Sequence, residues 1–198
     1  MGSGKSVVGA ILADLGAHVI DADKIAHRVY VPQSEGWRRI VDAFGNEVLA
    51  PEGTIDRKKL AAIVFADAAR LGALNAIVHP LVFAAVMREI DERRAAGFAG
   101  PFVLEAPVLL EAKAGGLVDR IWVVTAPRAA VRARLAASRD LRWAEVDARL
   151  DAQLSDDQRR EHADLVIEND ADLAALRAKV EEAWCSLGVG LPPPGGSR

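Results

Sequence analysis

The chain has 198 residues, a length that suits one α/β domain with a small insertion. Apolar residues make up 51% of it, enough to build a core, and a net charge of −3 argues against a general attraction to nucleic acid or membranes. The single cysteine, Cys185, excludes an intramolecular disulfide and favours a reducing compartment. We see no signal peptide and no uninterrupted apolar run near the ~18 residues of a membrane span, and therefore expect a cytoplasmic protein.

The first elements follow from the spacing of apolar residues. Residues 5–15 repeat apolar positions with the period of a helix, and Gly16 is a plausible stop. Residues 18–20 are rich in β-branched side chains and predict a strand. A short helix over 23–30 should follow and end before Pro32, which cannot continue it.

The rest of the chain changes character twice. Residues 32–96 hold three helix-like stretches and predict a mostly helical insertion. Beyond them, buried strands alternate with helices, which is typical of a doubly wound parallel sheet. We expect strands at 102–104, 121–124 and 165–167, an arginine-rich helical stretch over 129–163, a last helix over 172–184 capped by Asp170 or Asp172, and a disordered tail over 191–198.

The chain opens with Gly2-Ser3-Gly4-Lys5-Ser6, the second half of the phosphate-binding pattern G-x-x-x-x-G-K-[ST]. Glycines let backbone N–H groups turn toward phosphate oxygens, and the N-terminus of a helix adds partial positive charge. In such a loop Lys5 reaches the β- and γ-phosphates, and the Ser6 hydroxyl holds Mg²⁺. The alternative is a linker remnant in which Lys5 merely starts a helix.

Two aspartates, Asp21 and Asp23, end the strand that follows this helix. Ligands bind at this edge of open α/β sheets, and an aspartate there can accept the proton of a hydroxyl that attacks a γ-phosphate. The alternative is an aspartate that caps the next helix. We expect Asp21, rather than Asp23, to be the cap or a structural acid.

Seven stretches, in order and suitably spaced over roughly residues 2–183, together resemble the dephospho-CoA kinase family. They are GSGKS, VIDADKIAHRV, GTIDRKKLAAIVF, LNAIVHPLV, LEAPVLLEA, VVTAPRAAVRARLAASRD and RLDAQLSDDQRREHADLVIEND. The resemblance implies that ATP phosphorylates the ribose 3′-hydroxyl of dephospho-CoA, giving CoA and ADP in the last step of CoA biosynthesis. Mg²⁺ is the implied metal.

The resemblance also implies a domain organisation. A five-stranded P-loop kinase core would span 1–31 and 97–190, with an arginine-rich lid at about 134–162. A helical domain over 32–96 would bind the CoA moiety. We expect dephospho-CoA as a small-molecule partner, no nucleic acid, no membrane, and a monomer or weak oligomer.

The same resemblance assigns catalytic roles to matching residues. It implies that Asp23 activates the ribose hydroxyl, beside Lys5 in the loop. Arg139 would be the lid arginine that neutralises the transferring phosphate, with Arg134 and Arg149 as rivals for that role. The alternative for Arg139 is a surface arginine among several.

Binding roles follow in the same way. Arg57 and His79 look like substrate-side residues; the alternatives are a solvated helix charge and a helix cap before Pro80. Asn169 would edge the adenine or be only a turn residue, and Glu105 would orient metal-bound water or be a buried acid satisfied by backbone. The implied nucleotide-binding set is Gly2, Ser3, Gly4, Lys5, Ser6, Val7 and Asn169; the substrate set is Asp23, Arg57 and His79; the metal set is Ser6 and Glu105.

Three departures from the family pattern stand out. The family carries a strand and L-T-G-G-[IM] before its G-S-G-K-S, where this chain has only Met1. We therefore expect the chain as written to be an incomplete form of a working kinase, its start assigned too late. Val7 replaces a small Thr or Ser, and Glu105 replaces the common Asp.

Two other readings stay open. One is a different small-molecule P-loop kinase, such as a nucleoside or shikimate kinase, although the IDR and HP segments argue against it. The other is a truncated protein that binds CoA-like ligands without turnover. A GTPase is not expected, because no N-K-x-D motif occurs.

Overall fold

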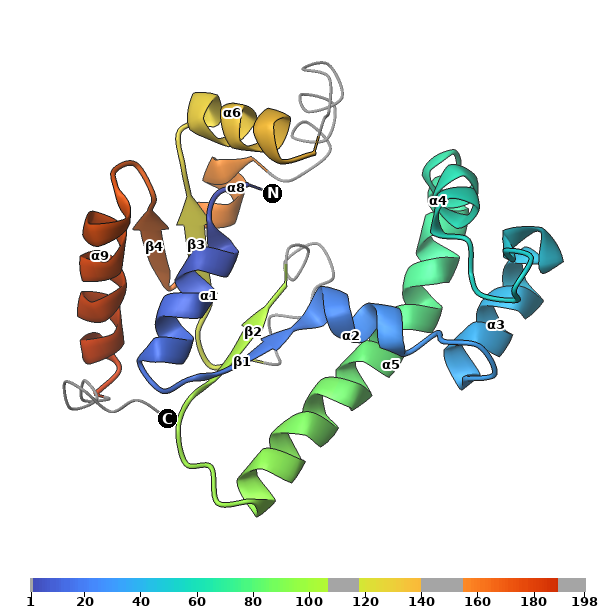
Figure 1. Ribbon diagram of the computed structural model, residues 1–198, viewed down its shortest axis with the longest axis horizontal. Helices are drawn as coiled ribbons and strands as arrows, with labels where there is room; N and C mark the ends of the chain where they lie inside the picture. Colours follow the sequence, from blue (N-terminus) through green and yellow to red (C-terminus); the bar gives the residue numbers. More distant parts are fainter. Residues whose placement is uncertain (1, 107–117, 140–154, 189–198) are drawn as a thin grey trace. The chain divides into compact units, whose positions relative to one another are not determined.

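A computed structural model describes residues 2–106, 118–139 and 155–188, with the backbone alone over 135–139. The chain forms two compact units, one made of Met1–Val19 with Gly100–Arg198 and the other of Ile20–Ala99. Each unit is described by itself (Figure 1). The domain organisation expected from the sequence also gives each segment a function, and that assignment stays a prediction.

The first unit carries the α/β part of the chain. Its elements are α1 (Lys5–Asp14), the start of β1 (His18–Asp21), β2 (Phe102–Glu105), β3 (Trp122–Thr125), α6 (Arg128–Arg139), α8 (Asp156–Arg160), β4 (Leu165–Glu168) and α9 (Leu173–Ser186). All four strands lie where the apolar runs predict them, each within a residue or so at its ends.

The strands form two pairs. β1 lies beside β2, and β3 pairs with β4 in parallel, with Trp122 opposite Leu165 and Thr125 opposite Glu168. Parallel neighbours need a crossover connection, which the stretch holding α6 and α8 supplies. Within the described residues, no strand joins the two pairs.

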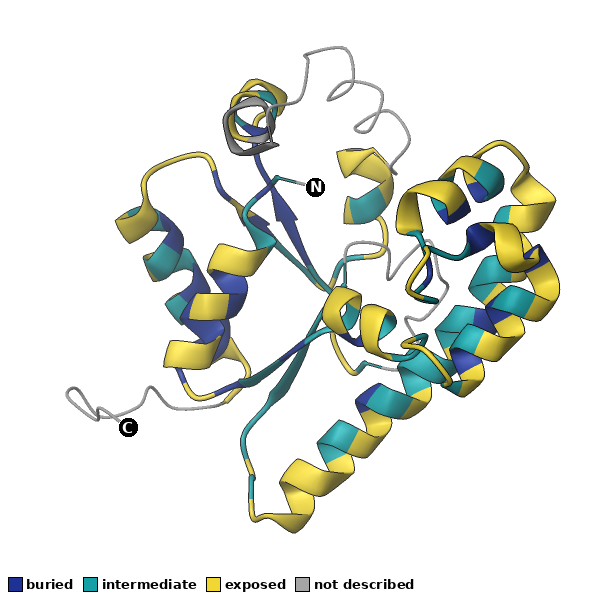
Figure 2. Ribbon diagram, turned by 45° about the vertical axis from the view of Figure 1, so that its right-hand side comes forward, coloured by how far each residue is buried: buried dark blue, intermediate teal, exposed yellow. Residues whose placement is uncertain are grey.

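Helices α1 and α9 pack together and cover the strands of this unit (Figures 1 and 2). Ile11 and Leu12 of α1 meet Val180 and Trp184 of α9, and Ile167 of β4 completes the buried cluster. Fully burying one such side chain is worth about 1.5–3 kcal/mol, so this cluster fixes α1 and the loop that precedes it.

Local signals place the ends of both helices. Gly16, just after α1, has φ +102°, a left-handed conformation that glycine adopts readily, so the expected stop is confirmed. At the start of α9 the Asp172 side chain accepts a hydrogen bond from the Ala175 N–H at 2.9 Å. Asp170 instead pairs with Lys179 at 2.7 Å, which leaves Asp172 as the cap.

The second unit is almost entirely helical, as its apolar spacing predicts. It contains the end of β1, then α2 (Ala22–Arg28), α3 (Glu35–Phe44), the 3₁₀ turn η1 (Asn46–Val48), α4 (Arg57–Phe65) and α5 (Ala68–Ala95). Helices α2, α3 and α4 all pack against α5. Its own buried cluster is centred on Ile40, Phe44, Val48, Leu60 and Ile77.

The long helix α5 runs without interruption through Pro80. The alternative that His79 caps a helix before Pro80 is therefore wrong. Proline removes one backbone N–H and disfavours a helix interior, but the contacts of α5 with three other helices outweigh this local cost.

Composition also singles out α5. An 18-residue window of this helix has a mean hydropathy of 1.5, so by length and composition it is apolar enough to cross a membrane. The sequence-based expectation of no membrane span considered only uninterrupted apolar runs. The mean hydropathy of an 18-residue window can stay high although the window contains the polar residues Asn75 and His79. Its partly buried Leu74 and Val78 pack on the cluster of the second unit, and 11% of that window is buried.

Other expectations lie outside the described residues. They are most of the arginine-rich stretch between α6 and α8, with Arg149, and the tail over 191–198.

Candidate active site

The glycine-rich loop leads directly into α1. Gly4 is the residue before the helix and has φ +101°, a conformation that disfavours side chains. Its carbonyl accepts hydrogen bonds from the N–H groups of Val7 and Val8, each at 3.0 Å. The first N–H groups of a helix lack acceptors within it, so this end of α1 favours an anion. Lys5 is the first residue of α1 and is half-buried.

A carboxylate from the sheet meets the loop. The Ser6 hydroxyl donates to Glu105 Oε1 at 2.6 Å, and Glu105 ends β2. A Cβ added at Gly9 would lie 3.3 Å from Glu105 Oε2, so the glycine leaves room for this carboxylate beside α1. Glu105 is half-buried and bonded to a side-chain hydroxyl, which does not fit the alternative of a buried acid satisfied by backbone.

This hydroxyl and carboxylate suit Mg²⁺, which prefers oxygen ligands. Among the described residues no group of three or more His, Cys, Asp or Glu gathers around one point.

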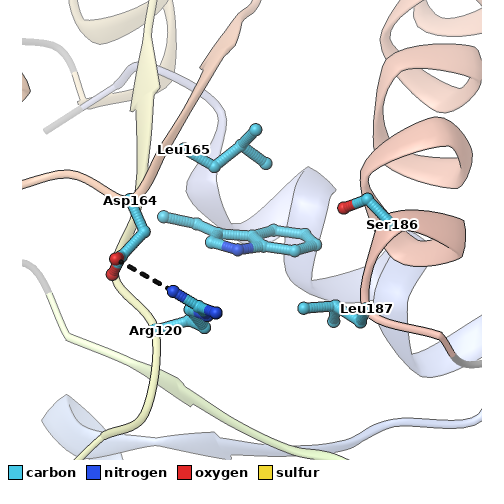
Figure 3. A pocket seen from close by; sticks show the side chains of 6 residues that line it. Arg120, Asp164, Leu165, Ser186 and Leu187 are labelled. Atoms are coloured by element: carbon cyan, nitrogen blue, oxygen red, sulfur yellow. Dashed lines mark hydrogen bonds and ion pairs between the residues drawn. The ribbon is translucent and has the colours of Figure 1, made fainter.

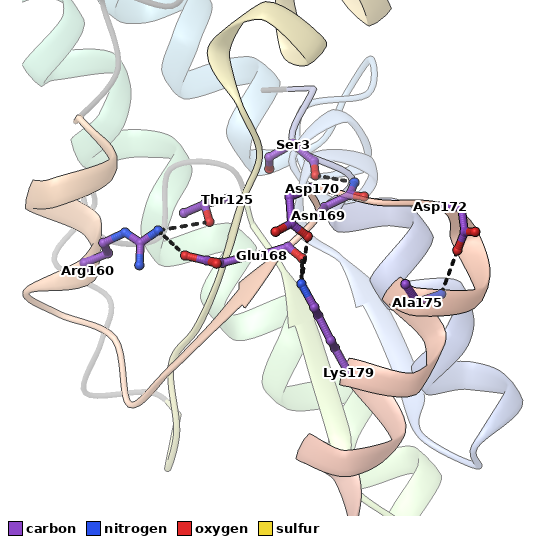
Figure 4. A network of polar contacts seen from close by, with 9 residues as sticks. All are labelled: Ser3, Thr125, Arg160, Glu168, Asn169, Asp170, Asp172, Ala175 and Lys179. Carbon is purple, nitrogen blue, oxygen red and sulfur yellow. Dashed lines mark hydrogen bonds and ion pairs between the residues drawn. The ribbon is translucent and has the colours of Figure 1, made fainter.

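A second contact reaches the loop from β4. The Asn169 side-chain amide donates through Nδ2 to the Ser3 carbonyl at 2.8 Å, and both residues are buried (Figure 4). The Asn169 backbone N–H donates to the Thr125 carbonyl at 2.8 Å. Sequence reasoning placed Asn169 near the nucleotide, but nothing in the local pattern indicated a bond to Ser3.

Charged side chains brace the end of β4 around Asn169 (Figure 4). Arg160 of α8 donates to Glu168 Oε1 at 2.8 Å and to the Thr125 hydroxyl at 3.5 Å. The hydrogen bond that Arg160 donates to Glu168 raises the pKa of the Arg160 guanidinium, which therefore stays charged. Lys179 of α9 donates to the Glu168 carbonyl at 2.8 Å. Sequence reasoning missed Arg160 and Thr125, because no motif contains them.

In the second unit, Asp21 and Asp23 lie in different environments. The Asp21 side chain accepts a hydrogen bond from the Lys24 N–H at 3.0 Å and so caps α2, as expected. Burial alone would raise the pKa of Asp21, but the hydrogen bonds and charge of Lys24 outweigh it and lower that pKa. Asp23 lies exposed in the first turn of α2. Its carboxylate is thus separate from the cap.

The expected substrate residues lie on helices of the same unit. Arg57 is the first residue of α4 and is exposed, while His79 is half-buried in the middle of α5. Burial raises the pKa of the Tyr30 hydroxyl, and the positive charge of Arg57 offsets part of this rise. Arg57 therefore acts on a neighbouring side chain as well as facing water.

The arginines of the expected lid are only partly described. Arg139 is the last residue of α6, and its side chain is outside the described part of the chain. Arg134 is exposed on the same helix. The choice among the candidate arginines stays a prediction.

A pocket of about 300 Å³ lies elsewhere in the first unit (Figure 3). It is lined by Arg120, Trp122, Asp164, Leu165, Ser186 and Leu187. These residues stand at the starts of β3 and β4 and at the end of α9, whereas Asn169 follows the end of β4. The pocket is therefore distinct from the loop site.

Comparison with known proteins assigns the family. The sequence profile described as dephospho-CoA kinase matches residues 1–175. A dephospho-CoA kinase of Moorella thermoacetica is 44% identical over 198 residues, covering 98% of this chain and 93% of the relative. The chain belongs to the dephospho-CoA kinase family. It is therefore a kinase, and ATP is its phosphoryl donor.

Further relatives agree with this assignment. A dephospho-CoA kinase of Symbiobacterium thermophilum is 42% identical over 98% of this chain and 82% of its own length. Among solved structures, a Thermus thermophilus protein superposes with a TM-score of 0.80 at 33% identity, over 94% of this chain and 93% of that one. Dephospho-CoA kinase from Campylobacter jejuni follows at 0.67 and 26% identity, over 94% and 92%. The expected α/β fold of P-loop kinase type is thus confirmed.

Proposed function

We propose that this chain transfers the γ-phosphoryl group of ATP to the ribose 3′-hydroxyl of dephospho-CoA, giving CoA and ADP. Beside the family assignment, the observation that carries the proposal is the hydrogen bond between the Ser6 hydroxyl and Glu105. It joins a phosphate-type loop to a strand-end carboxylate, the pair of groups that a kinase needs beside a nucleotide.

The loop residues bind the phosphates of ATP. Backbone N–H groups over Gly2–Ser6 and the N-terminus of α1 attract the negative charge, and Lys5 adds a full positive charge at the β- and γ-phosphates. Val7, 40% exposed in the first turn of α1, borders this loop.

Ser6 and Glu105 are the residues that would hold Mg²⁺. A bound Mg²⁺ would neutralise charge on the phosphate oxygens. Their direct hydrogen bond keeps the hydroxyl and the carboxylate within reach of one ion.

Asp23 accepts the proton of the ribose hydroxyl as that oxygen attacks. This role comes from the resemblance of the VIDAD segment to the family. The exposure of Asp23 supports it, and so does the separate capping role of Asp21.

Arg57 and His79 bind the substrate, and Arg139 neutralises charge on the transferring phosphate. The family resemblance of their segments supports these roles, as does the exposed position of Arg57 at the start of α4. We also propose that the chain works in the cytoplasm, as a monomer or weak oligomer.

An ADP-release assay tests the proposal. With ATP and Mg²⁺, dephospho-CoA should be turned over, whereas adenosine and shikimate should give only the background rate. Preferential turnover of adenosine or shikimate would identify another small-molecule kinase instead. ATP binding without turnover of any of the three would favour a binding protein.

A further inference from the structure

We propose that Asn169 is a positioning residue that sets the direction of a backbone N–H in the phosphate loop. Its side-chain amide holds the Ser3 carbonyl, and this fixes the peptide unit between Ser3 and Gly4 (Figure 4). The inference rests on the proposed function in one respect, namely that this loop binds the phosphates of ATP.

The geometry of one peptide unit carries the first step. A trans peptide is planar, and its C=O and N–H point in opposite directions. The described residues contain no cis peptide bond, so the Ser3–Gly4 unit is trans. Because Asn169 Nδ2 holds the Ser3 carbonyl at 2.8 Å, the Gly4 N–H must point away from Asn169. A flip of this peptide would exchange that donor for a carbonyl oxygen, which repels phosphate.

Secondly, Gly4 and the Asn169 amide are closely packed. A Cβ built on Gly4 would lie 2.3 Å from Asn169 Nδ2, closer than two such atoms can approach. The amide thus lies directly against the Gly4 backbone, whose φ of +101° also favours glycine. Glycine here serves the contact with Asn169 as well as the turn of the loop.

The anchoring of Asn169 carries the third step. Asn169 is only 7% exposed, and its own N–H is tied to the Thr125 carbonyl. On its N-terminal side, Glu168 is held through its side chain by Arg160 and through its carbonyl by Lys179. An amide fastened in this way can resist a peptide flip in the loop.

This role differs from an adenine contact. One hydrogen of Nδ2 is bonded to Ser3, and the role inferred here acts on the phosphates through the loop, so it needs no contact with the base. When Asn169 is replaced, the affinity for a ligand that has phosphates but no base should therefore fall as much as the affinity for ATP.

Two nearly isosteric variants test the inference, Asn169→Leu and Asn169→Asp. Leucine removes the donor, and the ionised aspartate places an oxygen against the Ser3 carbonyl. The dissociation constants of ATP and of inorganic tripolyphosphate are measured by calorimetry, and kcat and KM for ATP by ADP release. We expect both ligands to bind about 10-fold more weakly in either variant, as loss of one hydrogen bond to a charged group implies. The KM for ATP should rise by a similar factor.

Asp172→Asn is the matched control, because it keeps a capping oxygen at the start of α9 and changes neither the loop nor the side chains that anchor Asn169. It should leave both affinities unchanged. The inference is overturned if ATP weakens while tripolyphosphate does not, if neither weakens, or if the control loses as much. If leucine prevents folding, as judged by circular dichroism, the aspartate variant decides.

The readouts also separate this inference from the proposed function. An unmodified chain that binds ATP and tripolyphosphate but does not phosphorylate dephospho-CoA contradicts the function, while the binding data still decide the role of Asn169. An unmodified chain that binds no tripolyphosphate overturns the inference itself.

Discussion

The proposed roles of the charged residues Lys5 and Asp23 rest on different evidence. Lys5 opens α1 beside a loop whose backbone geometry is described, so its role follows from motif and structure together. Asp23 is exposed in the first turn of α2, and its role follows from the family segment around it. Kinetics can test each residue separately.

Replacing Lys5 by alanine should weaken ATP binding and also depress turnover. The charge at the β- and γ-phosphates is lost in the ground state and in the transition state. We expect kcat to fall by at least ~10²-fold, the range for removing one donor to the transition state. Steady-state kinetics and ATP titration check this, with Arg39→Ala, an exposed arginine of α3, as the charge-loss control. Survival of both ATP affinity and kcat would reduce GSGKS to a helix start.

Replacing Asp23 by asparagine should affect chemistry more than binding. We expect kcat to fall by ~10²-fold or more, the range for a general base, with little change in ATP affinity. Asp42→Asn, an exposed acid on α3, is the control and should keep its activity. A near-normal kcat in Asp23→Asn would remove this residue from the mechanism.

At the scale of elements, aspartate caps fix where α2 and α9 begin. Asp21 and Asp172 each accept a backbone N–H from the first turn of their helix. A cap satisfies one of the N–H groups that a helix leaves without an acceptor, and its negative charge suits that end. Position along the chain therefore decides which aspartates are structural.

The Asp21 cap predicts a pH dependence of stability. Its folded-state pKa is lowered, so the ionised carboxylate stabilises the fold above its unfolded pKa and loses this effect as pH falls through the folded value. Asp21→Asn retains a capping oxygen but no charge. The melting temperature of the parent chain should therefore exceed that of the variant near pH 7 and converge with it below about pH 4. A difference that stays constant over pH 3–7 would contradict the assignment.

The two aspartates before α9 should differ in their effect on stability. Asp172→Ala removes a cap and should lower the free energy of unfolding by about 1 kcal/mol. Asp170→Ala removes only a solvent-exposed ion pair, and should change stability little. Urea denaturation of both variants checks this order, which the reverse result would refute.

At the scale of the molecule, the described strands form two separate pairs and not one continuous sheet. β2 and β3 belong to different pairs, and all four residues of the apolar strand β2 are only half-buried. Strands of a parallel sheet are normally covered on both faces. The described strands thus leave edges of β2 and β3 to which a further parallel strand can add.

A longer chain should therefore be more stable and more active if the upstream DNA encodes, in frame, an apolar run ending in Gly-Gly. Each buried backbone group that gains a partner avoids a cost of ~1–3 kcal/mol, and the strand would anchor the first turn of the loop. Melting temperature, ATP affinity and turnover should all rise, whereas a Gly-Ser extension of equal length should change none of them. Equal values in the short and extended chains would contradict this prediction.

The elements themselves follow from local sequence. Apolar spacing predicts the four described strands and the ends of α1, and the family motifs indicate the loop, because each signal lies within a few neighbouring residues. The spacing also indicates one helix-like stretch through Pro80, and contacts with other helices support α5 there.

The side chains that contact the loop could not be predicted from local sequence. Ser6 and Glu105 are 99 positions apart, and Ser3 and Asn169 are 166 positions apart. No pattern of neighbouring residues specifies such pairs, because they form only when α1 packs beside β2 and β4 ends against the loop. The sequence alone thus identified the chemistry of the loop, whereas the packing of distant elements selected the side chains that orient it.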